Sequence, residues 1–228
     1  MTSAREDILA NIRRSLGVTG SEAPRHTDVA TRLQSAPAGL IPARGQLAPA
    51  ARVAMFRHQA ERAQASVAEV ARPEDVPTEV ARFLRDHNLP ATIRMGADAR
   101  FAAMPWSETT LEVATGRSDG NDPNAVSHAF GGVAESGTLA MVSGSDNPTT
   151  LNFLPDNHIV VISAADIAGD YETVWRRLRD QFGRGTMPRT VNMITGPSRS
   201  ADIEQTLLLG AHGPRTLHII VVGKPAAT

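Results

Sequence analysis

Four short and nearly uninterrupted apolar runs constrain the fold of this chain more than any other feature of its sequence. They are residues 138–142, 158–162, 190–194 and 217–222. A run of this kind is typical of a strand that is buried on both faces of a sheet. Because strand and helix alternate along the later part of the chain, we expect parallel pairing with helices on the sheet faces. The sequence therefore predicts an α/β fold with a mostly parallel sheet.

The rest of the body adds helices and strands to this core. Apolar residues at helical spacing predict helices at residues 51–64, 76–87 and 164–182. Shorter apolar segments predict further strands at residues 66–70, 89–95, 111–114 and 125–130. The last of these strands could pair antiparallel with residues 138–142, so a mixed sheet stays open.

The amino terminus is predicted to be a short amphipathic helix. Ser3 and Glu6 have the spacing of a capping box, in which each side chain bonds the backbone N–H of the other residue. An apolar stripe follows, formed by Ile8, Leu9, Ile12 and Leu16. A helix this short is marginal alone. Its stripe is therefore expected to dock on its own body, on another copy of the chain, or on a partner.

The segment after this helix is predicted to be a flexible linker. Residues 18–50 are rich in Gly, Ser, Pro and Ala and have almost no periodicity. We therefore divide the chain into an amino-terminal helix with its linker, residues 1–50, and a body, residues 51–228. A long linker permits partner docking or exchange between copies, so a homo-oligomer stays open.

Composition excludes several classes of function. The net charge is −1 and the pI is about 6.7, which does not favour binding to nucleic acid or to an anionic membrane. No apolar run approaches the roughly 20 residues that span a bilayer, and no apolar signal core follows the polar first residues. We expect a cytoplasmic protein without a membrane span.

Cysteine and histidine usage bears on metals and redox groups. The chain has no Cys, which excludes disulfides, a thiolate nucleophile and any zinc or iron–sulfur site that uses this chain's own thiolates. The seven His residues are scattered singly, and no pair has the spacing His-x-x-x-His. No metal site is predicted.

Residues 195–204, with the sequence TGPSRSADIE, are the first candidate functional segment. They follow an apolar run, break at Gly196, and then restart at helical spacing, which predicts a strand, a tight turn and a helix that ends at Gly210. Ser198 nearly fits a nucleophile elbow, but the spacing to an acid and a base is not that of a hydrolase. We therefore favour Ser198 or Ser200 as a cap of the predicted helix. The same turn could bind an anion at the carboxyl ends of the strands.

Residues 134–138, with the sequence AESGT, are the second candidate. Glu135 stands among small residues just before a buried strand, so it could act as a general base or as a nucleophile on an activated acyl group. Alternatively it braces the turn. Gly137 would let a ligand or another backbone segment approach closely.

Residues 210–215, with the sequence GAHGPR, are the third candidate. His212 lies in a loop shaped by two glycines and a proline, and it could titrate near neutral pH or simply bond the backbone of a tight turn. Arg199, His212 and Arg215 could together form a positive pocket for a carboxylate or a phosphate. The predicted ligand-binding residues are Gly137, Thr138, Thr195, Gly196, Ser198, Arg199, Ser200, Asp202, Gly213 and Arg215, with Glu135 and His212 as candidate catalytic groups.

The same three segments, together with the opening helix and its variable linker, resemble the lactate utilization protein C family, whose body is the LUD domain. Residues 195–204 and 210–214, in this order and at this distance, are the specific part of the resemblance, and residues 134–138 alone are a weak signal. The chain differs from the usual family pattern in carrying Ser136 where Thr is common.

The resemblance implies a three-layer α/β/α fold similar to that of ribose-phosphate isomerases, glucosamine-phosphate deaminases and CoA transferases. It also implies a role in oxidising L-lactate to pyruvate with partner proteins that carry iron–sulfur clusters, while this chain binds no cofactor itself. We expect a non-redox subunit that binds a small carboxylate, or its partner, near residues 135, 196–202 and 212–214. The alternative is a stand-alone enzyme, similar to a CoA transferase or a sugar-phosphate isomerase, that uses Glu135.

Overall fold

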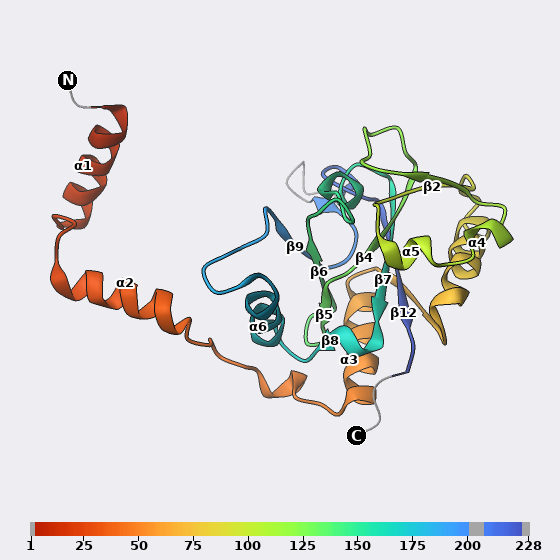
Figure 1. Ribbon diagram of the computed structural model, residues 1–228, viewed down its shortest axis with the longest axis horizontal. Coiled ribbons are helices and arrows are strands. Elements are labelled where there is room, and N and C mark those ends of the chain that lie inside the picture. Colours follow the sequence, from red (N-terminus) through yellow and green to blue (C-terminus); the bar gives the residue numbers. More distant parts are fainter. Residues whose placement is uncertain (1–2, 201–207, 225–228) are drawn as a thin grey trace. The chain divides into compact units, whose positions relative to one another are not determined.

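A computed structural model describes residues 3–200 and 208–224 of the chain (Figure 1). Two compact units are present, Met1–Leu40 and Ile41–Thr228, and each is described by itself. In the described ranges, no helix has both the length and the apolar composition needed to cross a bilayer.

The first unit contains two helices, α1 (Ala4–Leu16) and α2 (Ala23–Ser35). The predicted capping box of α1 is confirmed, because Ser3 Oγ accepts from Glu6 N at 3.3 Å and Glu6 Oε2 accepts from Ser3 N at 2.7 Å. Helix α2 lies in the segment expected to be a flexible linker, residues 18–50, so that prediction is wrong for residues 23–35. Val29 and Leu33 are the only large aliphatic residues within α2, which explains why periodicity missed it.

The second unit is built on a six-stranded sheet in which all neighbouring strands are parallel. The strand order is β1 (Ser66–Val70), β12 (Thr216–Val222), β7 (Asn157–Ser163), β4 (Asn124–His128), β2 (Thr92–Met95) and β3 (Glu112–Thr115). The expected mostly parallel α/β sheet is therefore confirmed.

Both faces of this sheet are covered. Helix α3 (Pro49–Arg62) and a smaller sheet cover one face, while α4 (Val76–Asp86) and α5 (Ala99–Ala102) cover the other. Successive side chains of β12 alternate between the two sides, with Ile219 in the core under α3 and Ile220 in the core under α4. Burial on both faces is the physical reason for the apolar run at residues 217–222.

The smaller sheet corrects part of the predicted topology. Its strand order is β8 (Ile167–Ala168), β5 (Gly131–Val133), β6 (Thr138–Val142) and β9 (Val191–Ile194). The runs at residues 138–142 and 190–194 thus belong to a second sheet, where they pair antiparallel with each other. Strand β5, rather than residues 125–130, is the antiparallel partner of β6 on its other side. Strand β6 is buried and β9 is partly buried, and both pack against cores on their two faces, so their composition resembles that of the main sheet.

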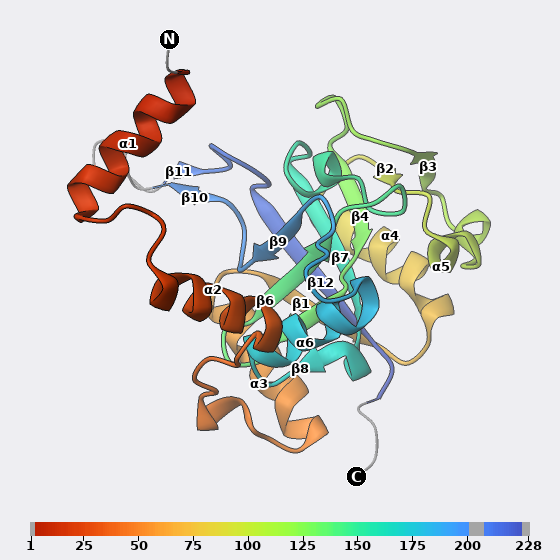
Figure 2. The ribbon, with the colours of Figure 1, turned by 60° about the vertical axis from the view of Figure 1, so that its left-hand side comes forward.

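Helix α6 (Tyr171–Phe182) packs on the outer side of the smaller sheet through Val174 and Leu178 (Figure 2). It begins later than the predicted residue 164 because Asp170 caps it, accepting from Thr173 N at 2.8 Å. Short 3₁₀ helices complete the unit: η1 (Ala43–Gly45), η2 (Pro73–Asp75), η3 (Trp106–Glu108), η4 (Thr149–Asn152) and η5 (Ala164–Asp166).

The predicted helix after Ser198 is wrong at both of its ends. Strand β10 (Arg199–Ser200) pairs antiparallel with β11 (Leu208–Leu209). Gly210 N donates to Ser198 O at 3.1 Å, a pairing across the hairpin that helical spacing of apolar residues cannot reveal. The middle of this segment, including Asp202, lies outside the described residues.

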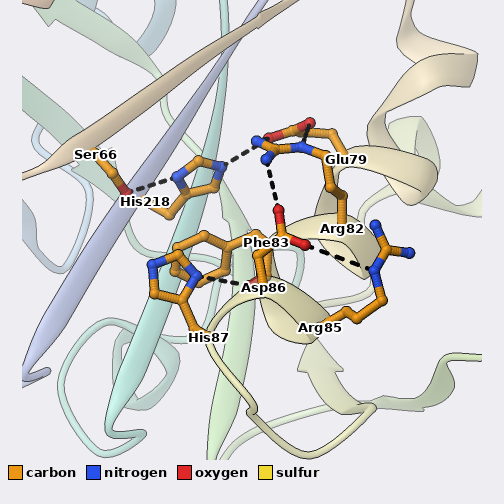
Figure 3. Close-up of polar contacts among 8 residues, drawn as sticks. All are labelled: Ser66, Glu79, Arg82, Phe83, Arg85, Asp86, His87 and His218. Atoms are coloured by element: carbon orange, nitrogen blue, oxygen red, sulfur yellow. Dashed lines mark hydrogen bonds and ion pairs between the residues drawn. The ribbon is translucent and has the colours of Figure 1, made fainter.

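A set of polar contacts centred on His218 joins α4 to the main sheet (Figure 3). His218, on β12, bonds Ser66 Oγ through Nδ1 at 2.8 Å and Glu79 Oε1 through Nε2 at 3.3 Å, and its ring stacks on Phe83 with centroids 4.1 Å apart. Arg82 Nε also donates to Glu79, at 2.7 Å. Burial raises the pKa of Glu79, but the hydrogen bonds from His218 and Arg82 outweigh it and lower this pKa to about 2.

The substitution Glu79→Gln is expected to reduce the free energy of unfolding by about 1–3 kcal/mol at pH 7, because it removes a charged acceptor shared by two donors. Since the pKa of Glu79 is lowered in the folded state, its contribution is complete above the unfolded pKa and is lost as pH falls toward 2. Urea unfolding should therefore separate variant and wild type at pH 7 and bring them closer at pH 3. The matched control is Asp75→Asn in the exposed Arg72 pair, with a change within about 0.5 kcal/mol.

Candidate functional site

The two predicted loops do meet at a cavity, of about 260 Å³. We call it the loop cavity, and it is lined by Asn152, Phe153, His158, Ser198, Arg199 and His212, among others. His158 is the second residue of β7 and Leu217 is the second residue of β12, so the cavity lies at the amino ends of these main-sheet strands. The expectation that these loops lie at the carboxyl ends of the strands is therefore wrong for the main sheet, although residues 195–198 do follow the carboxyl end of β9.

Ser198 holds the two loops together. Its backbone N–H donates to Pro214 O at 2.8 Å, and its Oγ accepts from the backbone N–H of His212 at 3.3 Å. The Ser198 hydroxyl thus bonds the backbone of His212 and caps no helix, since residues 199–200 form a strand. A Cβ added at Gly213 would lie 3.4 Å from Ser198 Cβ, so the two loops are closely packed at this point.

Two buried polar side chains form the inner wall of the loop cavity. His158 is 1% exposed and Asn152 is also 1% exposed. His158 Nε2 and Asn152 Nδ2 have no hydrogen-bond partner among the described residues, although Asn152 Oδ1 accepts from Ser127 Oγ at 3.4 Å. Burial lowers the pKa of His158 to about 3, so the ring is neutral near pH 7. Unpaired buried polar atoms are costly, which makes this wall suited to a polar ligand.

Little in the sequence pointed to these two residues. His158 follows a polar residue at the start of an otherwise apolar strand, and Asn152 lies in a polar turn. The signal available was a histidine within a run predicted to be buried on both faces, because such a ring needs a partner.

The remaining walls define what the loop cavity can hold. Phe153, Met193, Ile194 and Leu217 are apolar, and Arg199 is exposed at the rim. The loop cavity thus combines a cation from Arg199, an amide donor from Asn152 and apolar walls in a small volume. This combination suits a small organic acid. Arg215, a predicted ligand residue, is instead paired with Asp156 at 3.3 Å.

Glu135 is not among the described residues that line the loop cavity, so the predicted three-way convergence with Ser198 and His212 is incomplete. The side chain is 5% exposed, and its Oε2 lies 3.6 Å from Arg44 Nε. This ion pair is too long for a hydrogen bond, and Oε2 has no hydrogen-bond partner among the described residues. Arg44 comes from the segment assigned to the linker, where Gln46 likewise contacts the body by donating to Asp170 at 2.9 Å.

The predicted residues Thr138 and Thr195 lie in a hydroxyl network that ties the two motif segments together. Their Oγ1 atoms are 2.7 Å apart, and Thr138 Oγ1 lies 2.8 Å from the Tyr171 hydroxyl. Ser136 Oγ donates to the same hydroxyl at 3.0 Å. These hydroxyl groups form hydrogen bonds with one another. No pattern in the sequence indicated that Tyr171 takes part in this network.

Gly137 and Gly196 permit close backbone approach, and the segment that approaches is α3. A Cβ at Gly137 would lie 2.3 Å from Ala60 N, and one at Gly196 would lie 2.0 Å from Ala63 O. Of the two alternatives for Gly137, the structure thus supports packing of another backbone segment.

Comparison with known proteins bears on the family. Residues 124–222 match the model of the LUD domain. A segment of 91 residues is 40% identical to the lactate utilization protein C of Geobacillus sp. (strain WCH70), covering 40% of this chain and 38% of that protein. The corresponding protein of Geobacillus kaustophilus (strain HTA426) is 33% identical over 126 residues, or 52% of each chain. The alignments thus cover between about two fifths and one half of these relatives.

A crystal structure of a DUF162 family protein from Deinococcus radiodurans superposes with a TM-score of 0.57 at 19% identity, covering 78% of this chain and 99% of that one. At this identity the likeness concerns the fold alone. Together these similarities confirm the expected resemblance to the lactate utilization protein C family and its LUD domain.

Proposed function

We propose that this chain, which carries a LUD domain over residues 124–222, acts in lactate utilization as a subunit that holds no redox group. The name lactate utilization protein C of its relatives supports this role. Oxidation of L-lactate to pyruvate releases two electrons, and a chain without Cys cannot hold an iron–sulfur cluster through its own thiolates. The electrons therefore pass to partner proteins that carry iron–sulfur clusters.

The ligand in this proposal is a small carboxylate of the lactate and pyruvate class, bound in the loop cavity. The observation that carries it is the convergence of the two motif loops on a small cavity that contains an uncommitted amide, Asn152 Nδ2. The ligand carboxylate accepts from Arg199 and from this amide, while its methyl group packs on Phe153. His212 is the group that accepts the proton of the α-hydroxyl, and the hydrogen on the α-carbon leaves as a second proton as the two electrons pass to the partner proteins.

The variant Arg199→Gln tests the binding site, because Arg199 is exposed and its replacement leaves the core intact. Isothermal titration with pyruvate should show affinity reduced by about 10-fold or more, the loss expected for a charge-assisted hydrogen bond. Arg199→Lys should recover part of it. The matched control is Arg117→Gln, an exposed arginine outside the cavity, which should bind as the wild type does. Equal affinities of the Arg199→Gln variant and wild type would place the ligand elsewhere.

The partner assignment has a separate test. When the tagged chain is purified from the cells that naturally produce it, iron and acid-labile sulfide should copurify in a fixed ratio to the chain. The preparation should also show the visible absorbance of iron–sulfur clusters. Removal of those partners should remove all of this signal. A chain that purifies with partners containing no iron, or that oxidises lactate by itself, contradicts the proposed role.

A further inference from the structure

A second and larger cavity, of about 610 Å³, lies away from the motif loops. We call it the switch crevice, because the connections that follow β2 and β4 go to opposite sides of the sheet there. Its lining includes Arg100, His128, Phe130, Asn147, Asp166 and Arg177. His128 is the last residue of β4, and Arg100 follows the end of β2. The switch crevice therefore lies at the carboxyl ends of the main-sheet strands, whereas the loop cavity lies at their amino ends.

The strand connections explain why an opening exists there. Strands β2 and β4 are parallel neighbours, with Met95 opposite Val126. The chain leaves β2 toward α5, whose Phe101 packs in the core on the α4 side of the sheet. It leaves β4 toward β5 and β6, whose Leu139 packs in the core on the α3 side, and Figure 1 shows α5 and β6 on opposite sides of β4. Such a reversal between adjacent parallel strands is where open α/β sheets bind ligands.

Two guanidinium groups enter the switch crevice from different elements, Arg100 from α5 and Arg177 from α6. Arg100 forms a two-point ion pair with Asp98, which is 5% exposed: Nε donates to Oδ1 at 2.9 Å and Nη2 donates to Oδ2 at 2.5 Å, and these bonds do not use Nη1. Arg177 Nη1 donates to Asp166 O at 2.8 Å, and this bond does not use its Nε and Nη2. Both arginines are thus positioned by the protein and retain donors for an anionic group.

His128 supplies an acceptor in the same crevice. Its Nδ1 lies 2.9 Å from Ala129 O, and a carbonyl can only accept, so Nδ1 carries the proton. Burial, aided by the charge of Arg100, lowers the pKa of His128, which favours the neutral form of the ring. Its Nε2 is therefore a lone-pair acceptor, and no hydrogen bond to it occurs in the described parts of the chain.

A second acceptor also lacks a donor. Asn147 is 3% exposed, and its Nδ2 donates to Val142 O at 3.0 Å, which fixes the orientation of the amide. Its Oδ1 is buried and has no hydrogen-bond partner among the described residues. Asp146 and Asp166 add carboxylates to the lining. This composition suits one acid group together with several hydroxyl donors, and it does not suit a polyanion.

We propose that the switch crevice binds a polyhydroxylated organic acid, with its acid group on Arg100 and Arg177 and a hydroxyl group donating to His128 Nε2. This site is distinct from the loop cavity and from the role proposed above. A volume more than twice that of the loop cavity is large for a three-carbon acid and lies within the range of typical small-molecule sites. The acid group can be a carboxylate or a phosphate, since both match the fork of an arginine.

Four six-carbon probes of the full-length chain separate the elements of the proposal in calorimetric titrations. Gluconate carries a carboxylate and hydroxyls, glucitol 6-phosphate carries a phosphate and hydroxyls, glucitol lacks the acid group, and hexanoate lacks the hydroxyls. At least one of the first two should bind about 10-fold or more tightly than both glucitol and hexanoate. Which of the two binds more tightly identifies the acid group. Equal affinity for all four, or no binding of either hydroxylated acid, overturns the proposal.

Substitutions on α6 locate the site. Arg177→Gln should weaken binding of the hydroxylated acid by about 10-fold or more, while Arg176→Gln, on the same helix and outside the lining, should not. Arg100→Gln is the second variant should Arg177→Gln lower the thermal midpoint. Neither Arg177→Gln nor Arg100→Gln should alter the affinity for pyruvate in the loop cavity. A failure of the switch-crevice proposal is therefore distinguishable from a failure of the proposed function. Wild-type affinity in both Arg177→Gln and Arg100→Gln overturns the assignment.

Discussion

Replacing Gly196 by alanine is expected to reduce the free energy of unfolding by about 3 kcal/mol or more, because an unfavourable backbone conformation and a backbone clash add at this position. Gly196 has a φ of 72°, where an L-residue with a side chain costs about 1–2 kcal/mol. The added Cβ would also lie 2.0 Å from Ala63 O, a backbone atom at the end of α3. A clash with backbone cannot be relieved by a rotamer change, so α3 or the loop must move.

Gly137→Ala should behave in the same way for the same reason. Its φ is 66°, and a Cβ would lie 2.3 Å from Ala60 N. Ala60 and Ala63 are three residues apart, so the two motif turns contact neighbouring points on one helix. Buried Phe56, one turn earlier, belongs to the core that the main and smaller sheets share with α3. Displacing α3 therefore disturbs the packing of both sheets.

The matched control is Gly223→Ala. Gly223 has a φ of 83° but no atom within 4 Å of an added Cβ, so it reports the conformational cost alone, about 1–2 kcal/mol. Urea unfolding of the three variants and wild type, followed by circular dichroism, gives the comparison. If Gly196→Ala and Gly137→Ala lose no more stability than Gly223→Ala, the close contact with α3 is not present in solution.

This contact also shows what the sequence could reveal about the motif segments. A glycine before a buried strand predicts close approach, and that expectation for Gly137 is confirmed. The identity of the approaching segment was not predictable, because Ala60 lies 77 positions earlier and is one alanine among many. Short-range pattern identifies a constrained backbone position but does not identify its long-range neighbour.

The elements of the main sheet were predictable where burial dictated composition. Strand β1 has the predicted bounds, and β12 extends the predicted run at residues 217–222 by one residue. For β12, apolar residues are required on both faces because the sheet is covered on both sides. The same reasoning failed to separate β6 and β9 from the main sheet, since a strand covered on both faces has the same composition in either sheet. Sheet membership depends on pairing partners, which composition does not encode.

The two cavities illustrate the same limit for sites. Ser198 and His212 were predictable as neighbours because each lies in a glycine-shaped loop, and the structure places both in the loop cavity. Arg100, His128 and Arg177 have no common motif, and only the reversal between β2 and β4 brings them together. A site assembled by topology becomes visible when the strand order is known.

Acidification from pH 6.5 to 4.5 is expected to destabilise the protein through His158, by about 2–3 kcal/mol. Burial lowers the pKa of His158 to about 3, whereas an unfolded histidine titrates near 6.5. At pH values between 3 and 6.5, the unfolded state therefore binds a proton at His158 and the folded state does not. Stability from this group is complete above pH 6.5 and falls as pH decreases toward 3. Glu79, with a pKa lowered to about 2, contributes fully above its unfolded value of 4.5 and loses this contribution only as pH falls below it, so it changes little between pH 6.5 and 4.5.

The variant His158→Gln isolates this contribution. The glutamine side chain keeps a polar group beside Asn152 but does not titrate, so its free energy of unfolding should vary less with pH between 6.5 and 4.5 than that of wild type. His128, whose pKa is also lowered by burial, remains in both proteins and cancels in the difference. The matched control is His26→Gln on the exposed surface of α2, which should leave the wild-type profile unchanged. Parallel profiles for His158→Gln and wild type would mean that the ring is protonated in the folded protein, and that a partner for Nε2 exists at the wall of the loop cavity.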